Sequence, residues 1–155
     1  MQVKELGHVV LFVADLNASA HFYREVLGWR TILPFTDGEV FSGAVAFNSP
    51  GGRTHHELLL IEVGSLATPI PSGRRVGMYH FGIKVGDSDD ELRAAHQVLV
   101  KNGVRILGAT DHGMSHSLYI LDPDGNELEV YIDVPDVDAQ DTKWWTDFKP
   151  SALRL

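Results

Sequence analysis

The stretch Asp111–Asp133, DHGMSHSLYILDPDGNELEVYID, predicts two strands joined by a tight turn. The turn is expected at DPDGN, because proline presets φ, glycine accepts a positive φ, and Asp and Asn side chains hydrogen-bond to the local backbone. The segment after the turn, ELEVYID, alternates strictly, so Glu127, Glu129 and Tyr131 share one face and three aliphatic side chains share the other. A row of carboxylates opposite a core face fits either a solvated sheet or a cavity that binds a metal ion. We favour the metal ion.

Composition narrows the range of partners. The chain has 155 residues, 44% of them hydrophobic, which is enough for one well-packed core. The formal net charge of -8 disfavours nucleic acid and anionic membrane surfaces. Because the chain has no cysteine, a metal site can use only His, Asp or Glu side chains. No signal-peptide pattern opens the chain and no apolar run approaches about 18 residues, so we expect a cytoplasmic protein with no membrane span.

The first half of the chain predicts a β-α-β-β-β pattern. A strand is expected at Leu6–Ala14, followed by a helix that Asp15 or Asn17 caps and that runs to Leu27, where Gly28 ends it. Three further strands are expected around a Pro34–Gly38 loop and a Pro-Gly-Gly turn, at Trp29–Leu33, Val40–Phe47 and His55–Val63.

The same pattern starts again after a segment rich in proline and glycine, which we interpret as a linker. A strand is expected at Met78–Val85, and a capping box of Ser88 and Glu91 begins a helix that continues through Asn102. A short strand at 105–107 and the hairpin complete the unit. The predicted organisation is a first module at 1–63, a linker at 64–77, a second module at 78–133 and a C-terminal tail at 134–155.

The repeat also holds in register. His8 lies near the start of the first strand, and His80 lies near the start of the equivalent strand in the second module. Glu57 follows His8 by 49 positions, and Glu129 follows His80 by the same 49 positions. Neither module can close its own sheet. We therefore expect an α+β fold in which two βαβββ modules form one incompletely closed eight-stranded barrel with polar side chains inside.

The repeat brings His8, His80 and Glu129 toward one cavity. Two imidazoles and one carboxylate on one side of a cation leave positions open for substrate and oxygen, which suits Fe(II) first and Mn(II) next. The alternative is that each histidine is a satisfied core or edge residue and the glutamate is solvated. Register shared by both modules favours the metal site.

Four motifs carry a family resemblance: LGHVVLFVADL at 6–16, HFYREVLGW at 21–29, YHFGIKV at 79–85 and DPDGNELEVY at 122–131. Together they resemble the vicinal oxygen chelate superfamily, which includes glyoxalase I, bleomycin-resistance proteins and type I extradiol dioxygenases. The resemblance covers about Lys4 to Asp133. It implies that the metal ligands are His8, His80 and Glu129.

Three further stretches resemble single-domain type I extradiol enzymes similar to catechol 2,3-dioxygenase. THHEL at 54–58 implies that His56 is the acid–base histidine beside bound oxygen, and DHGMS at 111–115 implies a supporting role for His112. Tyr119 stands where those enzymes carry a tyrosine that hydrogen-bonds to the substrate. Two features depart from the pattern: the spacing from His112 to Tyr119 is two residues shorter than in two-domain enzymes, and the chain lacks their extra non-catalytic domain.

The resemblance implies an iron-dependent enzyme of aromatic catabolism, a homodimer that opens the ring of a catechol-type diol with O2. Both diol oxygens would chelate the metal, His56 would act as general acid–base, and Tyr119 and His112 would stabilise charge on the diol. Each of these three side chains could also have a purely structural role. His56 could form an exposed pair with His55, His112 could cap a turn, and Tyr119 could be a half-buried residue of the barrel.

Two other functions stay open. In glyoxalase-like members a fourth ligand comes from the strand that holds His56 and Glu57, and neighbours on a strand point to opposite faces. An inward Glu57 would complete a two-His two-Glu site suited to Ni or Zn in a lyase or isomerase. An inward His56 would leave the oxygen site open, which we favour. The third function is a metal-free protein that binds a drug or another small molecule.

The sequence leaves the substrate and the tail unassigned. Contacts to a substrate ring are expected from ordinary apolar residues such as Phe41, Val45 and Leu58. The tail carries three aromatic residues that are expected to cover apolar surface or a neighbouring subunit, or to roof the cavity: Trp144, Trp145 and Phe148.

Overall fold

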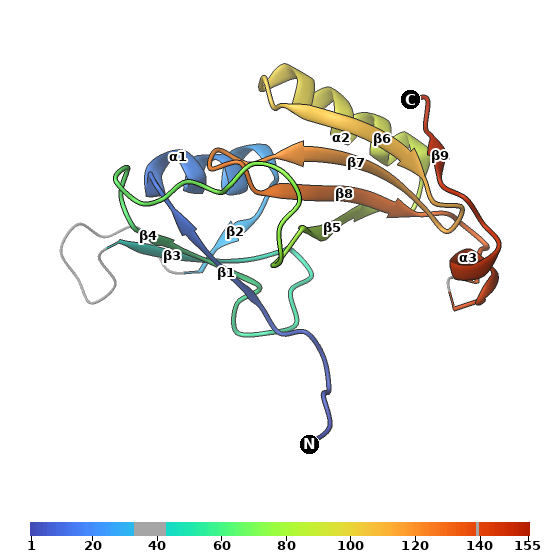
Figure 1. Ribbon diagram of the computed structural model, residues 1–155, viewed down its shortest axis with the longest axis horizontal. Coiled ribbons are helices and arrows are strands. Elements are labelled where there is room, and N and C mark those ends of the chain that lie inside the picture. Colours follow the sequence, from blue (N-terminus) through green and yellow to red (C-terminus); the bar gives the residue numbers. More distant parts are fainter. Residues whose placement is uncertain (33–42, 139) are drawn as a thin grey trace. The chain divides into compact units, whose positions relative to one another are not determined.

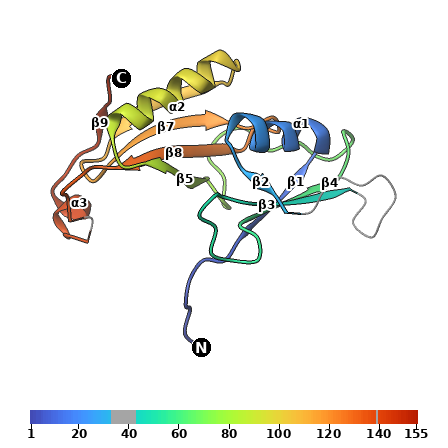
Figure 2. The ribbon, with the colours of Figure 1, turned by 180° about the vertical axis from the view of Figure 1, so that it is seen from behind.

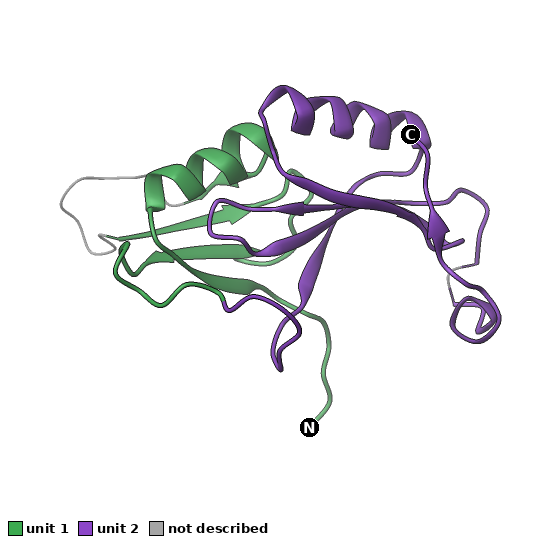
Figure 3. Cartoon of the chain, turned by 45° about the horizontal axis from the view of Figure 1, so that its top comes forward, with its two compact units in different colours: residues 1–70 green, residues 71–155 purple. Residues whose placement is uncertain are grey.

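The computed structural model divides the chain into two compact units (Figure 3), unit 1 at 1–70 and unit 2 at 71–155. It describes residues 1–32, 43–138 and 140–155. Each unit contains one sheet, and each repeats the order β-α-β-β-β along the chain (Figure 1). The predicted α+β chain with two βαβββ modules is confirmed. The barrel that both modules are expected to form together stays a prediction.

Unit 1 contains a four-stranded sheet with the strand order β1-β4-β3-β2. Its elements are β1 (Val9–Val13), α1 (Leu16–His21), η1 (Phe22–Val26), β2 (Arg30–Thr31), β3 (Ala44–Asn48) and β4 (Leu58–Glu62). β1 runs parallel to β4, and β3 is antiparallel to both of its neighbours. The predicted Pro34–Gly38 loop and Phe41 lie outside the described residues. Val45 and Leu58 are fully buried, so they pack in the core of the unit and not on an accessible surface.

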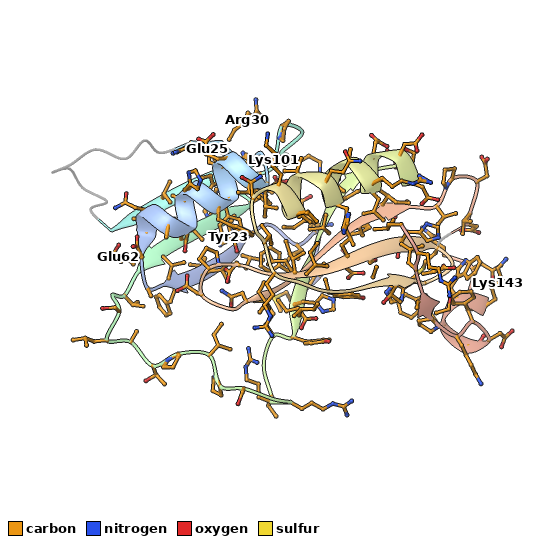
Figure 4. All side chains as sticks on the ribbon, turned by 90° about the horizontal axis from the view of Figure 1, so that it is seen from above. Tyr23, Glu25, Arg30, Glu62, Lys101 and Lys143 are labelled. Atoms are coloured by element: carbon orange, nitrogen blue, oxygen red, sulfur yellow. The ribbon has the colours of Figure 1, made fainter. Side chains whose placement is uncertain are left out.

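The predicted helix of unit 1 is present, but its hydrogen bonding changes partway. Asp15 caps it by accepting the N–H of Ala18 at 3.0 Å. The carboxylate of Glu62, labelled in Figure 4, accepts the N–H of Leu16 at 2.9 Å and so joins the helix start to β4. From Phe22 onward the backbone widens to a π-helix, in which the N–H of Leu27 donates to the carbonyl of Phe22 at 3.1 Å.

Two strands of unit 1 begin three residues later than predicted, at Val9 and Leu58. The physical reason is that the Thr54 side chain hydrogen-bonds to backbone carbonyls just before both strands. The Thr54 hydroxyl donates to the carbonyl of Gly7 at 3.1 Å and to the carbonyl of His56 at 2.6 Å. Backbone pairing continues as far as Glu57, whose N–H donates to the carbonyl of Phe47 at 2.9 Å. Before that residue, the Thr54 side chain takes the place of a strand neighbour for the carbonyls of Gly7 and His56.

Unit 2 contains a five-stranded sheet with the strand order β5-β8-β7-β6-β9. Its elements are β5 (His80–Gly86), α2 (Asp89–Lys101), β6 (Ile106–Asp111), β7 (Ser115–Leu121), β8 (Glu127–Asp133), α3 (Lys143–Thr146) and β9 (Ser151–Ala152). β5 runs parallel to β8, while β7 is antiparallel to both β8 and β6. Helix α2 lies along one face of this sheet in both views (Figures 1 and 2) and contacts β5, β7 and β8.

The hairpin predicted at 111–133 is confirmed. In its turn the Asp122 carboxylate accepts the N–H groups of Asp124 at 3.0 Å and Asn126 at 2.8 Å, and Gly125 has a φ of 87°. The alternation of β8 is also confirmed, because its aliphatic residues are all buried: Leu128, Val130 and Ile132. The polar residues of β8 therefore occupy the face of the sheet opposite the core.

Helix α2 begins as the sequence predicts. The Ser88 hydroxyl donates to the Glu91 carboxylate at 2.8 Å, and the N–H of Glu91 donates back to Ser88 Oγ at 3.4 Å. Leu92 and Leu99 of this helix are buried, which covers the aliphatic face of the sheet. In the described part of the chain, every helix is too short or too polar to cross a membrane.

Candidate metal and substrate site

The polar face of the unit 2 sheet brings His80 of β5 close to Glu129 of β8. Nε2 of His80 lies 3.1 Å from Oε2 of Glu129. The parallel register sets Gly82 opposite Glu129, so no side chain stands between the imidazole and the carboxylate. A Cβ added at Gly82 would lie 3.1 Å from the ring of Tyr131, which shows how closely the neighbouring aromatic ring fills this space.

Hydroxyl groups hold the other oxygen of the Glu129 carboxylate. Oε1 accepts the Ser117 hydroxyl at 2.6 Å and the Tyr119 hydroxyl at 3.4 Å. Nε2 of His112 lies 3.8 Å from the same oxygen. With Oε1 fixed by donors on β7, Oε2 faces His80. A carboxylate oriented in this way by neighbouring donors is the form in which Glu binds a metal through one oxygen.

Tyr119 and His112 form a second pair beside the carboxylate. Nε2 of His112 lies 2.8 Å from the Tyr119 hydroxyl. Burial, together with the negative charge of Glu129, raises the pKa of Tyr119 to about 12. The phenol is therefore protonated at neutral pH and can donate a hydrogen bond. The short spacing between the two residues in the sequence does not prevent their contact, because His112 lies in the connection between β6 and β7.

These side chains line a pocket of about 470 Å³ within unit 2. Its lining combines possible metal ligands, hydroxyl groups and aromatic rings: His80, Gly82, His112, Met114, Ser115, Tyr119, Glu129, Tyr131, Asp133 and Trp145. A concave site with a few converging polar groups and aromatic surface suits a small molecule.

In unit 1 the pairing of β1 with β4 brings His8 and His56 together. Their ring centroids lie 4.3 Å apart, and Nδ1 of His56 lies 2.6 Å from Nδ1 of His55. Burial and then the neighbouring His8 and His55 lower the pKa of His56. Nε2 of His56 is buried without a hydrogen-bond partner among the described residues. His56 is therefore a neutral imidazole at pH 7.

Glu57 has a different environment from His56. Its Oε2 accepts the N–H of Ser49 at 2.8 Å, in the connection between β3 and β4. Burial of Glu57 opposes its ionisation, but hydrogen bonds from Ser49 and Arg53 outweigh this effect and lower its pKa. The sequence left the choice between these neighbours open. In the structure His56 contacts His8, and Glu57 is bound to the turn.

The residues predicted to bind metal belong to different units: His8 to unit 1, and His80 with Glu129 to unit 2. Within the described ranges, no group of three or more His, Asp or Glu side chains forms a ready metal cluster. His80 and Glu129 still fit a cation. Their facing nitrogen and oxygen are the donor types that Fe(II) and Mn(II) bind, and a third donor must complete the site.

Sequence reasoning missed Ser117 and named Trp145 only as one of several tail residues that could roof the cavity. Ser117 is fully buried and orients Glu129, and the alternation of β7 could have found it because Ser117 shares a face with Tyr119. Trp145 lines the pocket from the C-terminal tail, where the sequence favoured covering apolar surface or a neighbouring subunit over roofing the cavity.

Several known proteins resemble this chain. It is 35% identical over 130 residues to the catechol-2,3-dioxygenase of Bacillus subtilis (strain 168), a match that covers 84% of this chain and 42% of that protein. It is 33% identical over 134 residues to the iron-dependent extradiol dioxygenase of Rhodococcus jostii (strain RHA1), covering 80% of this chain and 41% of that protein. The chain thus spans less than half the length of either dioxygenase.

A solved structure matches over most of both chains. The lactoylglutathione lyase of Agrobacterium tumefaciens superposes with a TM-score of 0.60 at 27% identity, covering 85% of this chain and 96% of that chain. Residues 5–130 match the profile of one protein family, so the match spans nearly all of both βαβββ modules. On this evidence the chain belongs to the glyoxalase/bleomycin resistance protein/dioxygenase superfamily.

Proposed function

We propose that this protein is a metal-dependent extradiol dioxygenase that opens the ring of a catechol-type diol with O2. The observation that carries the proposal is the pocket of unit 2, where His80 and Glu129 face each other beside a protonated tyrosine and aromatic surface. Similarity to two dioxygenases supports the same chemistry. The pocket volume of about 470 Å³ suits a substrate with one or two rings.

The proposed metal ligands are His8, His80 and Glu129. Fe(II) is the preferred cation, because the donor set suits it and because the Rhodococcus relative is an iron-dependent enzyme. Mn(II) is the second choice. A cation bound there would supply a template for diol and O2 and a path for electrons between them.

The chain's own side chains position the diol and move its protons. The Tyr119 hydroxyl, with a pKa of about 12, stays protonated and donates a hydrogen bond to a diol oxygen. His112 lies 2.8 Å from that hydroxyl and fixes its orientation. His56 is the proposed general acid–base: Nε2, which is buried and lacks a partner among the described side chains, accepts a proton during the reaction and returns it.

A glyoxalase-like lyase is the second candidate, and the likeness to lactoylglutathione lyase favours it. That function requires Glu57 as a fourth ligand, with Ni or Zn as the metal. The hydrogen bond from Ser49 to the Glu57 carboxylate counts against it, because Glu57 would have to break that bond to reach a cation.

One experiment separates these functions. The protein is purified without oxygen, its bound metal is measured, and catechol and oxygen are then added. Stoichiometric iron and a yellow ring-opened product support the dioxygenase. Nickel or zinc without this product supports the lyase, which is then assayed on a glutathione thiohemiacetal. Absence of bound metal under all of these conditions would contradict both enzymatic proposals and support the third function, a protein that binds a small molecule without metal.

A further inference from the structure

The C-terminal segment, residues 134–155, folds back onto the strands that carry the pocket. β9 pairs antiparallel with β6, where Ala152 is opposite Thr110. At the other end of the segment, the N–H of Val134 donates to the carbonyl of Met114 at 2.9 Å. The short helix α3 lies between these two attachments (Figure 1). The segment is therefore tied to unit 2 at both ends and is part of its structure.

Trp144 anchors α3 against the connection between β6 and β7. A Cβ added at Gly113 would overlap the Trp144 ring, and Gly113 also has a φ of 77°, which disfavours other residues. The Trp144 ring meets the Phe148 ring edge-on at 5.5 Å, and its Nε1 donates to the carbonyl of Asp138 at 2.9 Å. This tryptophan is fully engaged in holding the helix in place beside His112.

Trp145 has the opposite environment from its neighbour. Its side chain is 76% exposed, yet it lines the same pocket as His80 and Glu129. The exposed indole is thus available to a molecule that binds in this pocket. An indole bound to a rigid segment offers a flat apolar surface, and aromatic rings pack on it by offset stacking or edge-to-face contact.

We propose that Trp145 binds the aromatic ring of the substrate, so that the C-terminal segment supplies a specificity-determining wall of the pocket. The inference rests on the proposed diol-binding function. His80 and Glu129 occupy the polar part of the pocket where the diol oxygens bind, and Trp145 contacts the ring that carries them. Substituents on the ring meet the indole first, so Trp145 selects among substituted diols.

The test measures binding without turnover. 4-Nitrocatechol is titrated into the Fe(II)-loaded protein without oxygen, and its absorbance change gives a dissociation constant. Trp145→Ala should weaken binding about two- to thirteenfold, since an aromatic pair contributes about 0.5–1.5 kcal/mol beyond area burial. Trp145→Phe should restore most of the affinity. Val100→Ala is the control, because Val100 is 58% exposed on α2 and does not line the pocket.

A second variant, Gly113→Ala, tests the contact between Trp145 and the substrate ring indirectly. Gly113→Ala should displace Trp144 and with it Trp145, so it should weaken 4-nitrocatechol binding in the same direction. Thermal unfolding of each variant shows whether the fold is retained. If Trp145→Ala binds as tightly as the wild type, the ring contact is wrong, whatever Gly113→Ala does.

The outcomes also separate this inference from the proposed function. If the wild type binds 4-nitrocatechol but does not cleave catechol, the proposed dioxygenase function is wrong. The affinities of the variants then still test the contact between Trp145 and the ring. If the wild type cleaves catechol and Trp145→Ala binds 4-nitrocatechol with the same affinity as the wild type, only the ring contact is contradicted. Wild-type protein that binds no 4-nitrocatechol contradicts both.

Discussion

Nε2 of His80 and Oε2 of Glu129 lie 3.1 Å apart although 49 positions separate them in the chain. The parallel pairing of β5 with β8 creates this proximity, and Ser117 fixes the orientation of the carboxylate. An imidazole nitrogen and a carboxylate oxygen at this distance either hydrogen-bond to each other or bind one cation between them. The proposed function requires that the two atoms bind one cation, and the predictions below test this requirement.

His80→Ala should abolish tight metal binding. The substitution removes a ligand, and loss of a group that merely supports a ligand already weakens metal affinity about 10- to 100-fold. Metal content after purification and a titration with Fe(II) without oxygen measure the effect. His96→Ala is the matched control, because His96 lies on α2 and does not line the pocket. Equal metal content in both variants would contradict the assignment of His80.

Ser117→Ala should weaken metal binding about 10- to 100-fold while the protein stays folded. The Ser117 hydroxyl is buried and donates to Glu129 at 2.6 Å, so its loss removes the shorter of the two hydroxyl hydrogen bonds that orient the carboxylate. The measurement is the metal dissociation constant beside the thermal unfolding temperature. Unchanged affinity would show that the strands alone orient Glu129 and that Ser117 has no part in it.

His56→Ala should retain metal and lose turnover. A general acid–base contributes about 10²- to 10⁴-fold to a rate, so the variant should be slower by that factor at unchanged iron content. His55→Ala is the control: His55 is adjacent and exposed, and its substitution should have a smaller effect. A fully active His56→Ala variant would refute the acid–base role.

Local patterns predicted the hairpin and the face on which Glu129 lies, because alternation along a strand depends only on neighbouring residues. The choice between His56 and Glu57 was beyond such patterns. It depends on tertiary contacts: the Glu57 carboxylate accepts the N–H of Ser49, and the His56 ring lies beside the His8 ring. The sequence named Trp145 as one of three tail residues that could roof the cavity, but its place in the pocket lining depends on how the tail folds, which includes the pairing of β9 with β6, a long-range contact of a two-residue strand.

The capping box of α2 should make stability depend on pH in the acidic range. Hydrogen bonds from the backbone of Asp87 and the hydroxyl of Ser88 lower the pKa of Glu91 below the ordinary value of 4.5. A carboxyl group whose pKa is lower in the folded protein stabilises the fold above its unfolded pKa, and this contribution is lost as pH falls through the lowered value. The difference in unfolding free energy between wild type and Glu91→Gln should therefore be largest at pH 7 and shrink as the pH falls below 4.5 and through the lowered pKa of Glu91. A constant difference across this range would contradict the prediction.

Leu128→Ala should separate the stability of β8 from the site that the same strand carries. Leu128 is fully buried on the core face, whereas Glu129 points to the pocket. Removing a buried leucine side chain costs about 2–5 kcal/mol in unfolding free energy, because it removes apolar burial and leaves a cavity. Leu107→Ala, at a position that is 45% exposed on β6, should cost much less. Chemical denaturation measures both variants, and a metal titration well below the unfolding temperature should find the affinity of Leu128→Ala close to that of wild type. A large loss of metal affinity in the folded variant would mean that packing on the core face, and not only Ser117, sets the position of Glu129.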